Sequence, residues 1–172
     1  MRICCYYRKI YILRVVKINR ICCFAGHSNL YGLDGLLDDI KELAEELIVK
    51  ENVKEFWVGN YGSFDRLAAN AVRNLKEKYP HLQLNLVIPY LTTEINENKK
   101  MYYANYDNII IADIPENAPS KYRIVKCNEF MVQNSDFIIC YVQYSCGGAA
   151  KTLRYAEKQK HIKIFNLSIN KP

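Results

Sequence analysis

Short apolar runs alternate with longer amphipathic stretches along most of the chain, and this alternation limits the folds that the chain can adopt. In one amphipathic stretch, Leu36, Ile40, Leu43 and Leu47 recur at the three- and four-residue spacing of a helix with one apolar face. The spacing predicts strands at 21–25, 55–58, 82–88, 109–111, 137–142 and 162–165, and helices at 36–48, 65–78, 120–134 and 147–160. We therefore expect an α/β fold, a Rossmann-like three-layer sandwich with a mainly parallel sheet and helices on both faces.

The positive charge of the chain is confined to its first residues. The formal net charge is +6, from 24 Lys and Arg against 18 Asp and Glu. Residues 1–20 hold six of the basic residues and no acid, so residues 21–172 contain 18 of each sign and are neutral. A neutral body is not expected to bind nucleic acid, because non-specific binding depends on neutralising phosphates. We expect two regions, a basic N-terminal extension at 1–20 and a domain at 21–168.

The basic extension allows several interpretations. Polar and apolar residues alternate at 9–12 and 16–18, which favours a weakly ordered or edge-strand extension. A basic tether to a surface and translated upstream sequence are the alternatives. Its longest apolar run, 10–13, is interrupted by Arg14, so neither a secretory signal nor a transmembrane segment is expected.

Cysteine usage indicates a reducing compartment and no metal site. The chain has seven cysteines, an odd number, and no CxxC motif. Neighbours such as Cys22 and Cys23 cannot both point at one metal from a strand, because successive side chains face opposite ways. We expect small buried thiols, no cofactor and a cytoplasmic location.

The glycines point to a ligand site. All seven lie at 26–35, 59–62 and 147–148, and each cluster follows a predicted strand. In a parallel sheet these positions share the carboxyl edge, where such folds bind ligands. Glycine lets a ligand approach the backbone, and a following helix N-terminus favours an anion. Tight turns are the alternative explanation for each cluster alone. The GxxxxGK[ST] and GxGxxG motifs are absent, so the pattern favours a nucleotide-type ligand without a conventional fingerprint.

Several side chains beside these turns are candidates for ligand contact. His27 is expected near the rim, where it hydrogen-bonds or stacks on the ligand, and Asp65 either stabilises a helix N-terminus or accepts a ligand hydroxyl. Lys151 either meets a phosphate or lies on a solvated helix face, and Tyr90 is placed to stack on a base. The tyrosines of the long polar segment 90–108 are expected to pack in the core or a lid. The predicted ligand- and phosphate-binding residues are Gly26, His27, Ser28, Gly59, Asn60, Tyr61, Gly62, Asp65, Pro89, Tyr90, Ser145, Gly147, Gly148, Lys151 and Thr152.

Three motifs together resemble the SLOG superfamily, and more narrowly its small stand-alone bacterial members. They are Cys23-Phe24-Ala25-Gly26-His27, VGNYGSFDRLAANAV at 58–72 and NSDFIICYVQYSCGGAAKTLRYA at 134–156, and the resemblance covers about 21–167. It implies a Rossmann-like fold whose glycine-rich strand ends bind nucleotides or nucleotide-derived ligands, often ADP-ribose-like or nucleoside monophosphates. Paired domains in the superfamily imply a homodimer. Some members are phosphoribohydrolases, and others are sensors or DNA-processing proteins.

The catalytic residues of the phosphoribohydrolases do not carry over. Their last glycine turn reads PGGxGTxxE; Gly147 and Gly148 match it, but the glutamate register falls on Leu153 or Arg154. Met131 and Ser135-Asp136 match a second pattern whose arginine register holds Cys127, with Arg123 one turn earlier, and Ser28 replaces an arginine common in the smaller group. The resemblance thus implies the pocket without the reaction, which favours a sensing or sequestering protein over an enzyme. The alternatives are an N-glycosidic hydrolase that uses His27, Asp65 or Glu129, and a DNA-processing accessory protein.

Overall fold

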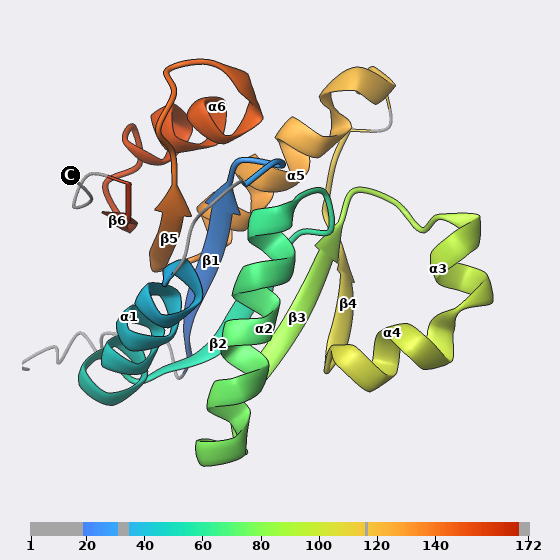
Figure 1. Ribbon diagram of the computed structural model, residues 1–172. Coiled ribbons are helices and arrows are strands. Elements are labelled where there is room, and N and C mark those ends of the chain that lie inside the picture. Colours follow the sequence, from blue (N-terminus) through green and yellow to red (C-terminus); the bar gives the residue numbers. More distant parts are fainter. Residues whose placement is uncertain (1–18, 31–34, 116, 169–172) are drawn as a thin grey trace, which may run out of the picture.

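The computed structural model describes residues 19–30, 35–115 and 117–168 (Figure 1). The predictions for residues 1–18 and for Gly32 lie outside these residues. The strands are β1 (Arg20–Gly26), β2 (Val53–Val58), β3 (Gln83–Ile88), β4 (Asn108–Ile111), β5 (Phe137–Tyr141) and β6 (Lys163–Asn166). The helices are α1 (Leu36–Glu51), α2 (Ser63–Lys78), α3 (Thr93–Glu97), α4 (Lys99–Asn105), α5 (Ser120–Asn134) and α6 (Gly147–Ala156).

The strands form one sheet in the order β4-β3-β2-β1-β5-β6, and every neighbouring pair is parallel. The chain builds the sheet outward from β1 to β4, then crosses over to place β5 on the other side of β1. The strand order therefore reverses at β1, and the connections that follow β1 and β5 diverge to opposite faces. Such a switch point opens a crevice at the carboxyl ends of the strands, and the arrows of β1, β3 and β5 point the same way in Figure 1.

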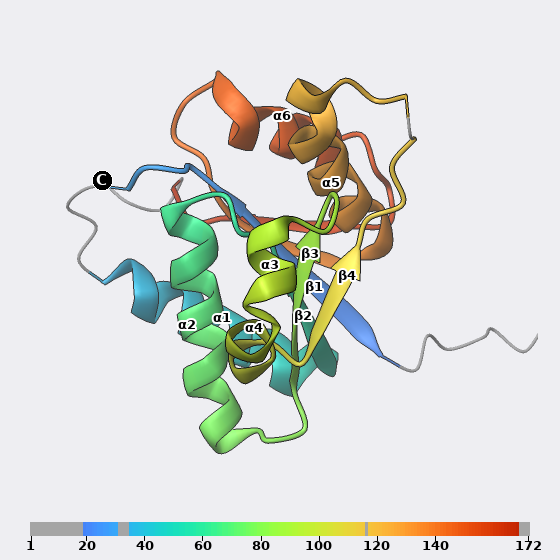
Figure 2. The ribbon, with the colours of Figure 1, turned by 90° about the vertical axis from the view of Figure 1, so that its right-hand side faces the viewer.

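Helices cover both faces of the sheet, which confirms the predicted fold class. On one face, Cys22 and Phe24 of β1 pack in a cluster with residues of α1 and α2. On the other, Cys23 and Ala25 pack with residues of α5 and α6. Figure 2, turned by 90°, shows the two pairs of helices on opposite sides of the strands. The adjacent cysteines thus face opposite ways, as the strand alternation predicts, and burial raises the pKa of the Cys23 thiol to about 12.

The segment 90–108 differs from the prediction, because most of it is helical. It contains α3 and α4, and Thr92 caps α3 by accepting a hydrogen bond from the Ile95 backbone amide at its Oγ1, at 3.2 Å. Ile95 and Tyr102 are buried against Leu86 and Ile88 of β3. Each of these helices buries a single apolar side chain, so neither produces the repeated spacing by which longer helices are recognised. Tyr102 packs in the core, as expected.

The ends of several elements also differ from the prediction. Helix α2 begins at Ser63, two residues earlier than predicted, and α6 ends at Ala156 rather than near residue 160. Helix α1 continues to Glu51 and is followed by Asn52, which adopts a left-handed conformation with φ of 56°. Asparagine tolerates this conformation and commonly ends helices. None of the described helices combines the length and apolar character needed to cross a membrane.

Candidate functional site

The glycine turns after β1, β2 and β5 meet at the carboxyl edge of the sheet around a cavity of about 300 Å³. We call it the glycine cavity. It lies over β1, where the strand order reverses, and helices α2, α5 and α6 contribute to its walls. Its lining residues are Phe24, Ala25, Gly26, His27, Ser28, Tyr61, Gly62, Asp65, Ile124, Asn128, Gly147, Gly148 and Ala149. The structure thus brings together residues from all three predicted glycine clusters.

His27 links the two sides of the switch point. Its Nε2 accepts a hydrogen bond from the Gln143 backbone amide at 3.0 Å, and its ring centroid lies 5.1 Å from that of Tyr144. Burial lowers the pKa of His27, which favours the neutral imidazole that this hydrogen bond requires. Because Nε2 is an acceptor, the ring proton belongs on Nδ1. His27 therefore attaches the loop after β5 to the end of β1, and proton abstraction at Nε2 would first have to break that attachment.

Asp65 places a carboxylate in the wall of the cavity. It lies in the first turn of α2, and its Oδ2 accepts a hydrogen bond from the Tyr61 backbone amide at 2.9 Å. Burial raises the pKa of this carboxyl to about 6, while the backbone amides of Tyr61 and Gly62 and the charge of Arg66 act in the opposite direction. Near neutral pH the group is thus an anion held by backbone donors in a partly desolvated position.

The glycines of the cavity have different physical roles. A Cβ added at Gly26 would lie 2.3 Å from Cγ of Phe64, and one added at Gly62 would lie 2.6 Å from Cα of Ser28. These two glycines allow β1, α2 and the loop after β1 to pack closely. Gly147 has φ of +91°, a conformation that side chains disfavour, and a Cβ at Gly148 would meet nothing within 4 Å. Gly148 therefore leaves open space beside the first turn of α6.

Thr152 and Arg154, which do not line the cavity, stabilise the turn at the start of α6 through hydrogen bonds. The Thr152 hydroxyl donates to the Gly148 carbonyl at 3.1 Å and accepts from Nδ2 of Asn128 at 3.2 Å. Arg154 donates to the Ser145 carbonyl at 2.7 Å. The side chain of Cys146, the N-cap residue, accepts no hydrogen bond from the backbone amides at the start of α6, so it does not cap the helix. Lys151 is exposed on the helix and does not line the cavity.

Other predicted site residues lie elsewhere. Pro89 lines a separate cavity with Arg123, whose guanidinium lies 5.3 Å from the centroid of the Tyr90 ring. Asn60 lines a third cavity, and Gly59 packs against Asp65. Glu129 forms an ion pair with Lys126 at 2.7 Å on α5 and is not part of the glycine cavity.

The prediction missed two side chains that α5 contributes, Ile124 and Asn128. Their helix was predicted, but nothing in its spacing shows which residues approach the crevice. One signal was available for Asn128, because it follows Cys127, the residue in the arginine register of the phosphoribohydrolases. Cys127 itself is buried, and burial raises its thiol pKa to about 12. The side chain that lines the cavity is therefore the uncharged amide beside it.

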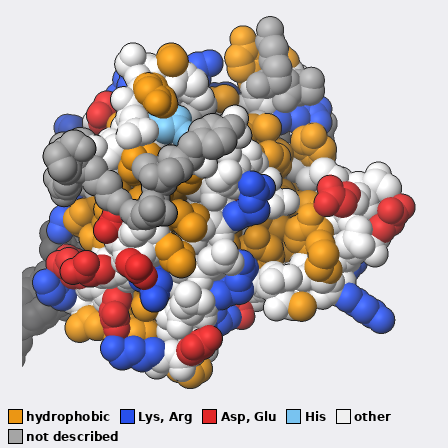
Figure 3. Space-filling model, viewed as in Figure 1, with side chains coloured by type: hydrophobic (Ala, Val, Ile, Leu, Met, Phe, Trp, Pro, Cys, Tyr) orange, Lys and Arg blue, Asp and Glu red, His pale blue; other side chains and the backbone are white. Residues whose placement is uncertain are grey.

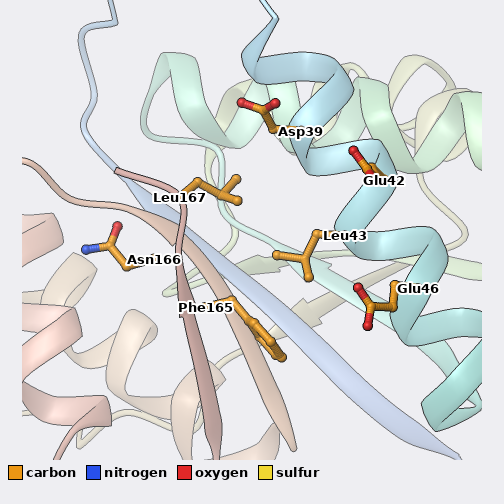
Figure 4. Close-up of a pocket in the computed structure, with 7 residues that line it drawn as sticks. All are labelled: Asp39, Glu42, Leu43, Glu46, Phe165, Asn166 and Leu167. Carbon is orange, nitrogen blue, oxygen red and sulfur yellow. The ribbon is translucent and has the colours of Figure 1, made fainter. Parts of the chain in front are cut away.

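A slightly larger cavity, of about 340 Å³, lies between α1 and the β6 segment (Figure 4). Asp39, Glu42 and Glu46 of α1 lie along one side, and Phe165 and Leu167 lie across from them. Carboxylates repel phosphate, and the described lining residues include no glycine and no basic side chain, so this cavity is a poor match for a nucleotide. Among the described residues, no group of three or more His, Cys, Asp and Glu side chains is arranged to hold a metal ion.

Two curated bacterial proteins are similar to this chain in sequence. The prophage-derived protein YoqJ of Bacillus subtilis is 28% identical over 138 residues, which cover 72% of this chain and 81% of YoqJ. A UPF0398 protein of Halalkalibacterium halodurans is 26% identical over 144 residues, covering 77% of this chain and 75% of that protein.

Solved structures of DNA processing protein A share the fold. The protein from Streptococcus pneumoniae superposes with a TM-score of 0.59 at 13% identity, over 87% of this chain and 50% of that one. The Helicobacter pylori protein, which binds single-stranded DNA, superposes with a TM-score of 0.57 at 16% identity, over 90% of this chain and 68% of that one. This chain thus spans half the length of the first of these proteins. The family model described as the YspA SLOG family matches residues 34–170.

The different roles of the glycines predict different costs of substitution. Gly26→Ala places a methyl group against the Phe64 ring, so we expect it to lower the free energy of unfolding by about 1–3 kcal/mol. The matched variant Gly148→Ala meets no neighbour within 4 Å and should change stability by less than about 0.5 kcal/mol. Urea unfolding of both variants measures the difference, and equal costs would contradict these roles.

Asp65 is expected to reduce stability at neutral pH. Its folded pKa of about 6 lies above its ordinary value of 3.8, so the ionised form weakens the folded state above pH 6, and the penalty disappears as the pH falls toward 4. Asp65→Asn should therefore raise the free energy of unfolding by about 1–3 kcal/mol at pH 7.5, with the gain vanishing near pH 4. Denaturant unfolding across this range tests it. Asp38→Asn, at an exposed first-turn acid of α1, is the control, and a gain at Asp65 that did not change with pH would refute the assignment.

Proposed function

The chain belongs to the YspA SLOG family, and from this premise we propose that it binds a nucleotide-derived small molecule in the glycine cavity, as a sensor or sequestering protein. The ligand class is a nucleoside monophosphate or an ADP-ribose-like molecule. The observation that carries the proposal is the open turn at Gly147 and Gly148, which lines the cavity at the N-terminus of α6. The cavity of about 300 Å³ is at the small end of the range for ligand sites and suits a nucleotide-sized group.

The phosphate is assigned to the α6 side of the cavity. Helix α6 begins at Gly147, and its first backbone amides, together with the helix dipole, favour an anion at this end. A Cβ at Gly148 would have no protein neighbour, which leaves space for a phosphate against the backbone. No carboxylate comes from α6 or from the turn before it among the lining residues. This side of the cavity therefore supports phosphate binding.

The sugar is assigned to the α2 side. The Asp65 carboxylate is anionic above pH 6 and would repel a phosphate, whereas it accepts hydrogen bonds from ribose hydroxyls. Asn128 lies in the cavity wall with an amide that both donates and accepts. The two sides thus match the two ends of a ribose phosphate.

Binding is favoured over turnover because the cavity lacks the charged pair that the phosphoribohydrolases use. Among the described lining residues, Asp65 is the carboxylate and none is an arginine. Cys127 is a buried neutral thiol, Arg123 packs on Tyr90, and Arg154 is bound to the Ser145 carbonyl. His27, another titratable side chain of the wall, uses Nε2 to hold the loop after β5. These contacts support recognition of a ligand, and the described lining residues include no arginine to pair with the Asp65 carboxyl in hydrolysis.

Calorimetric titration of the full chain with nucleoside 5′-monophosphates, ADP-ribose and cyclic ADP-ribose isomers tests the proposal. We expect one ligand of the panel to bind, and Gly148→Asp to weaken it by at least about 100-fold, because the new carboxylate occupies the phosphate position. Gly148→Ala, which adds bulk without charge, should weaken it less.

Several results would reject this function. They are no binding across the panel, binding that Gly148→Asp leaves unchanged, or release of free base on incubation with the bound nucleotide. A single-stranded oligonucleotide belongs in the same titrations, and tight binding of it alone would favour the DNA-processing alternative. From the superfamily resemblance we also expect a homodimer, which sedimentation of the free protein measures.

A further inference from the structure

A second cavity, of about 260 Å³, lies between α2 and α4 and is separate from the glycine cavity. We call it the arginine cavity. The turn at 59–62 borders both cavities, because Tyr61 lines the glycine cavity and Asn60 lines the arginine cavity. In Figure 3, basic side chains lie along the front of the molecule beside the hollow that leads toward α3 and α4. The lining residues are Asn60, Arg66, Asn70, Arg73, Met101, Tyr102, Asn105 and Tyr106.

We propose that the arginine cavity is a second anion site, which binds a phosphate group independently of the glycine cavity. Arg66 and Arg73 lie seven residues apart on one face of α2, and no carboxylate lines the cavity with them. Within the described part of the chain, neither arginine forms an ion pair. Asp65 interacts with Arg66 through its charge but forms no ion pair with it, so both guanidinium groups can attract an anion, and their planar donors match phosphate oxygens.

Three acids of the surrounding elements contact other groups. Asp107, which precedes β4, forms an ion pair with Lys76 at 2.5 Å and also accepts from the Leu84 backbone amide. Glu94 of α3 accepts a hydrogen bond from the Tyr102 hydroxyl at 3.3 Å. Asp65 lines the glycine cavity, where the Tyr61 backbone amide donates to it. The positive charge of the arginine cavity therefore remains available to a ligand.

The cavity holds its donors in place before a ligand arrives. Arg73 donates to the Asn70 side-chain oxygen and to the Asn105 carbonyl, and its guanidinium lies 5.9 Å from the centroid of the Tyr106 ring. The Asn70 oxygen thus accepts from Arg73, which orients its NH₂ group as a donor for another partner. Arg66 donates a 3.3 Å hydrogen bond to the Ser63 hydroxyl and is exposed. Arg73 is thus positioned by the protein, and Arg66 is accessible to an anion.

The cavity is suited to a phosphate rather than to a base. Tyr102 and Tyr106 stack on each other with centroids 6.5 Å apart and planes 20° apart, and Tyr102 is buried. The Arg73 guanidinium also contacts the Tyr106 ring. With the rings engaged in this way, recognition rests on charge and hydrogen bonding. Inorganic pyrophosphate and a nucleotide phosphate should therefore bind with similar affinity.

NMR titration with inorganic pyrophosphate tests the proposal, using the ¹⁵N-labelled full chain with Gly148→Asp, which closes the glycine cavity to phosphate. We expect the side-chain amide signals of Asn70 and Asn105 to shift on binding. Arg66→Gln should raise the dissociation constant for pyrophosphate at least about tenfold, as expected for losing one charged hydrogen-bond donor. Lys158→Gln removes the same charge from an exposed position at the end of α6 and should change it less than twofold.

A second arginine variant and a second ligand complete the test. Arg73→Gln should also weaken pyrophosphate binding, and thermal unfolding establishes whether loss of its contact with Tyr106 affects the fold. Adenosine 5′-monophosphate, titrated in the same way, separates a free phosphate from a nucleotide as the source of the group. A dissociation constant for adenosine monophosphate within about threefold of that for pyrophosphate supports recognition of the phosphate alone.

Several outcomes would overturn the inference. They are no shift of the Asn70 and Asn105 signals, equal effects of Arg66→Gln and Lys158→Gln, or adenosine monophosphate binding more than tenfold tighter than pyrophosphate. A single-stranded oligonucleotide that binds here while pyrophosphate does not would assign the cavity to nucleic acid instead. Because Gly148→Asp is present throughout, these results are independent of whether the glycine cavity binds its proposed ligand.

Discussion

The reversal of strand order at β1 is the constraint on which the rest of the structure depends. Because β5 pairs with β1 on the side opposite β2, the connections after β1 and β5 leave toward different faces of the sheet. Two hydrogen bonds connect the chain segments at this point of reversal. The Gln143 backbone amide donates to His27, and the Ser63 backbone amide donates to the Ser28 carbonyl at 2.8 Å. They attach both neighbouring connections to the end of β1, so the cavity between them has fixed walls.

Within that frame, glycine serves packing and ligand access at different positions. Gly26 and Gly62 allow the backbone of one element to approach another, whereas Gly148 faces open space. The Asp65 carboxylate, unlike these glycines, reduces stability, because burial raises its pKa and disfavours its ionised form. Functional sites often contain a partly buried charged group that lowers the stability of the fold. The properties of Asp65 therefore agree with its proposed contact with a ligand.

The turn at 59–62 and the first turn of α2 form a wall between the two cavities. Tyr61 and Asp65 belong to one side, and Asn60 and Arg66 to the other, so neighbouring residues in sequence serve different cavities. The charges divide in the same way. The Asp65 carboxylate faces the sugar position proposed for the glycine cavity, and the Arg66 guanidinium faces the phosphate proposed for the arginine cavity. Residues 21–172, although neutral overall, thus have a local separation of charge along one helix.

The sequence by itself determined the fold class, the order of the longer elements and the location of the glycine turns, because each is encoded in spacing between near neighbours. It could not reveal α3 and α4, whose single buried side chains, Ile95 and Tyr102, leave no periodic pattern. Only the tertiary structure decided what each turn residue contacts. His27 meets Gln143 across 116 residues of sequence, and Asn128 reaches the cavity from a helix with no glycine motif. Such contacts depend on how strands cross and helices pack, which local spacing does not encode.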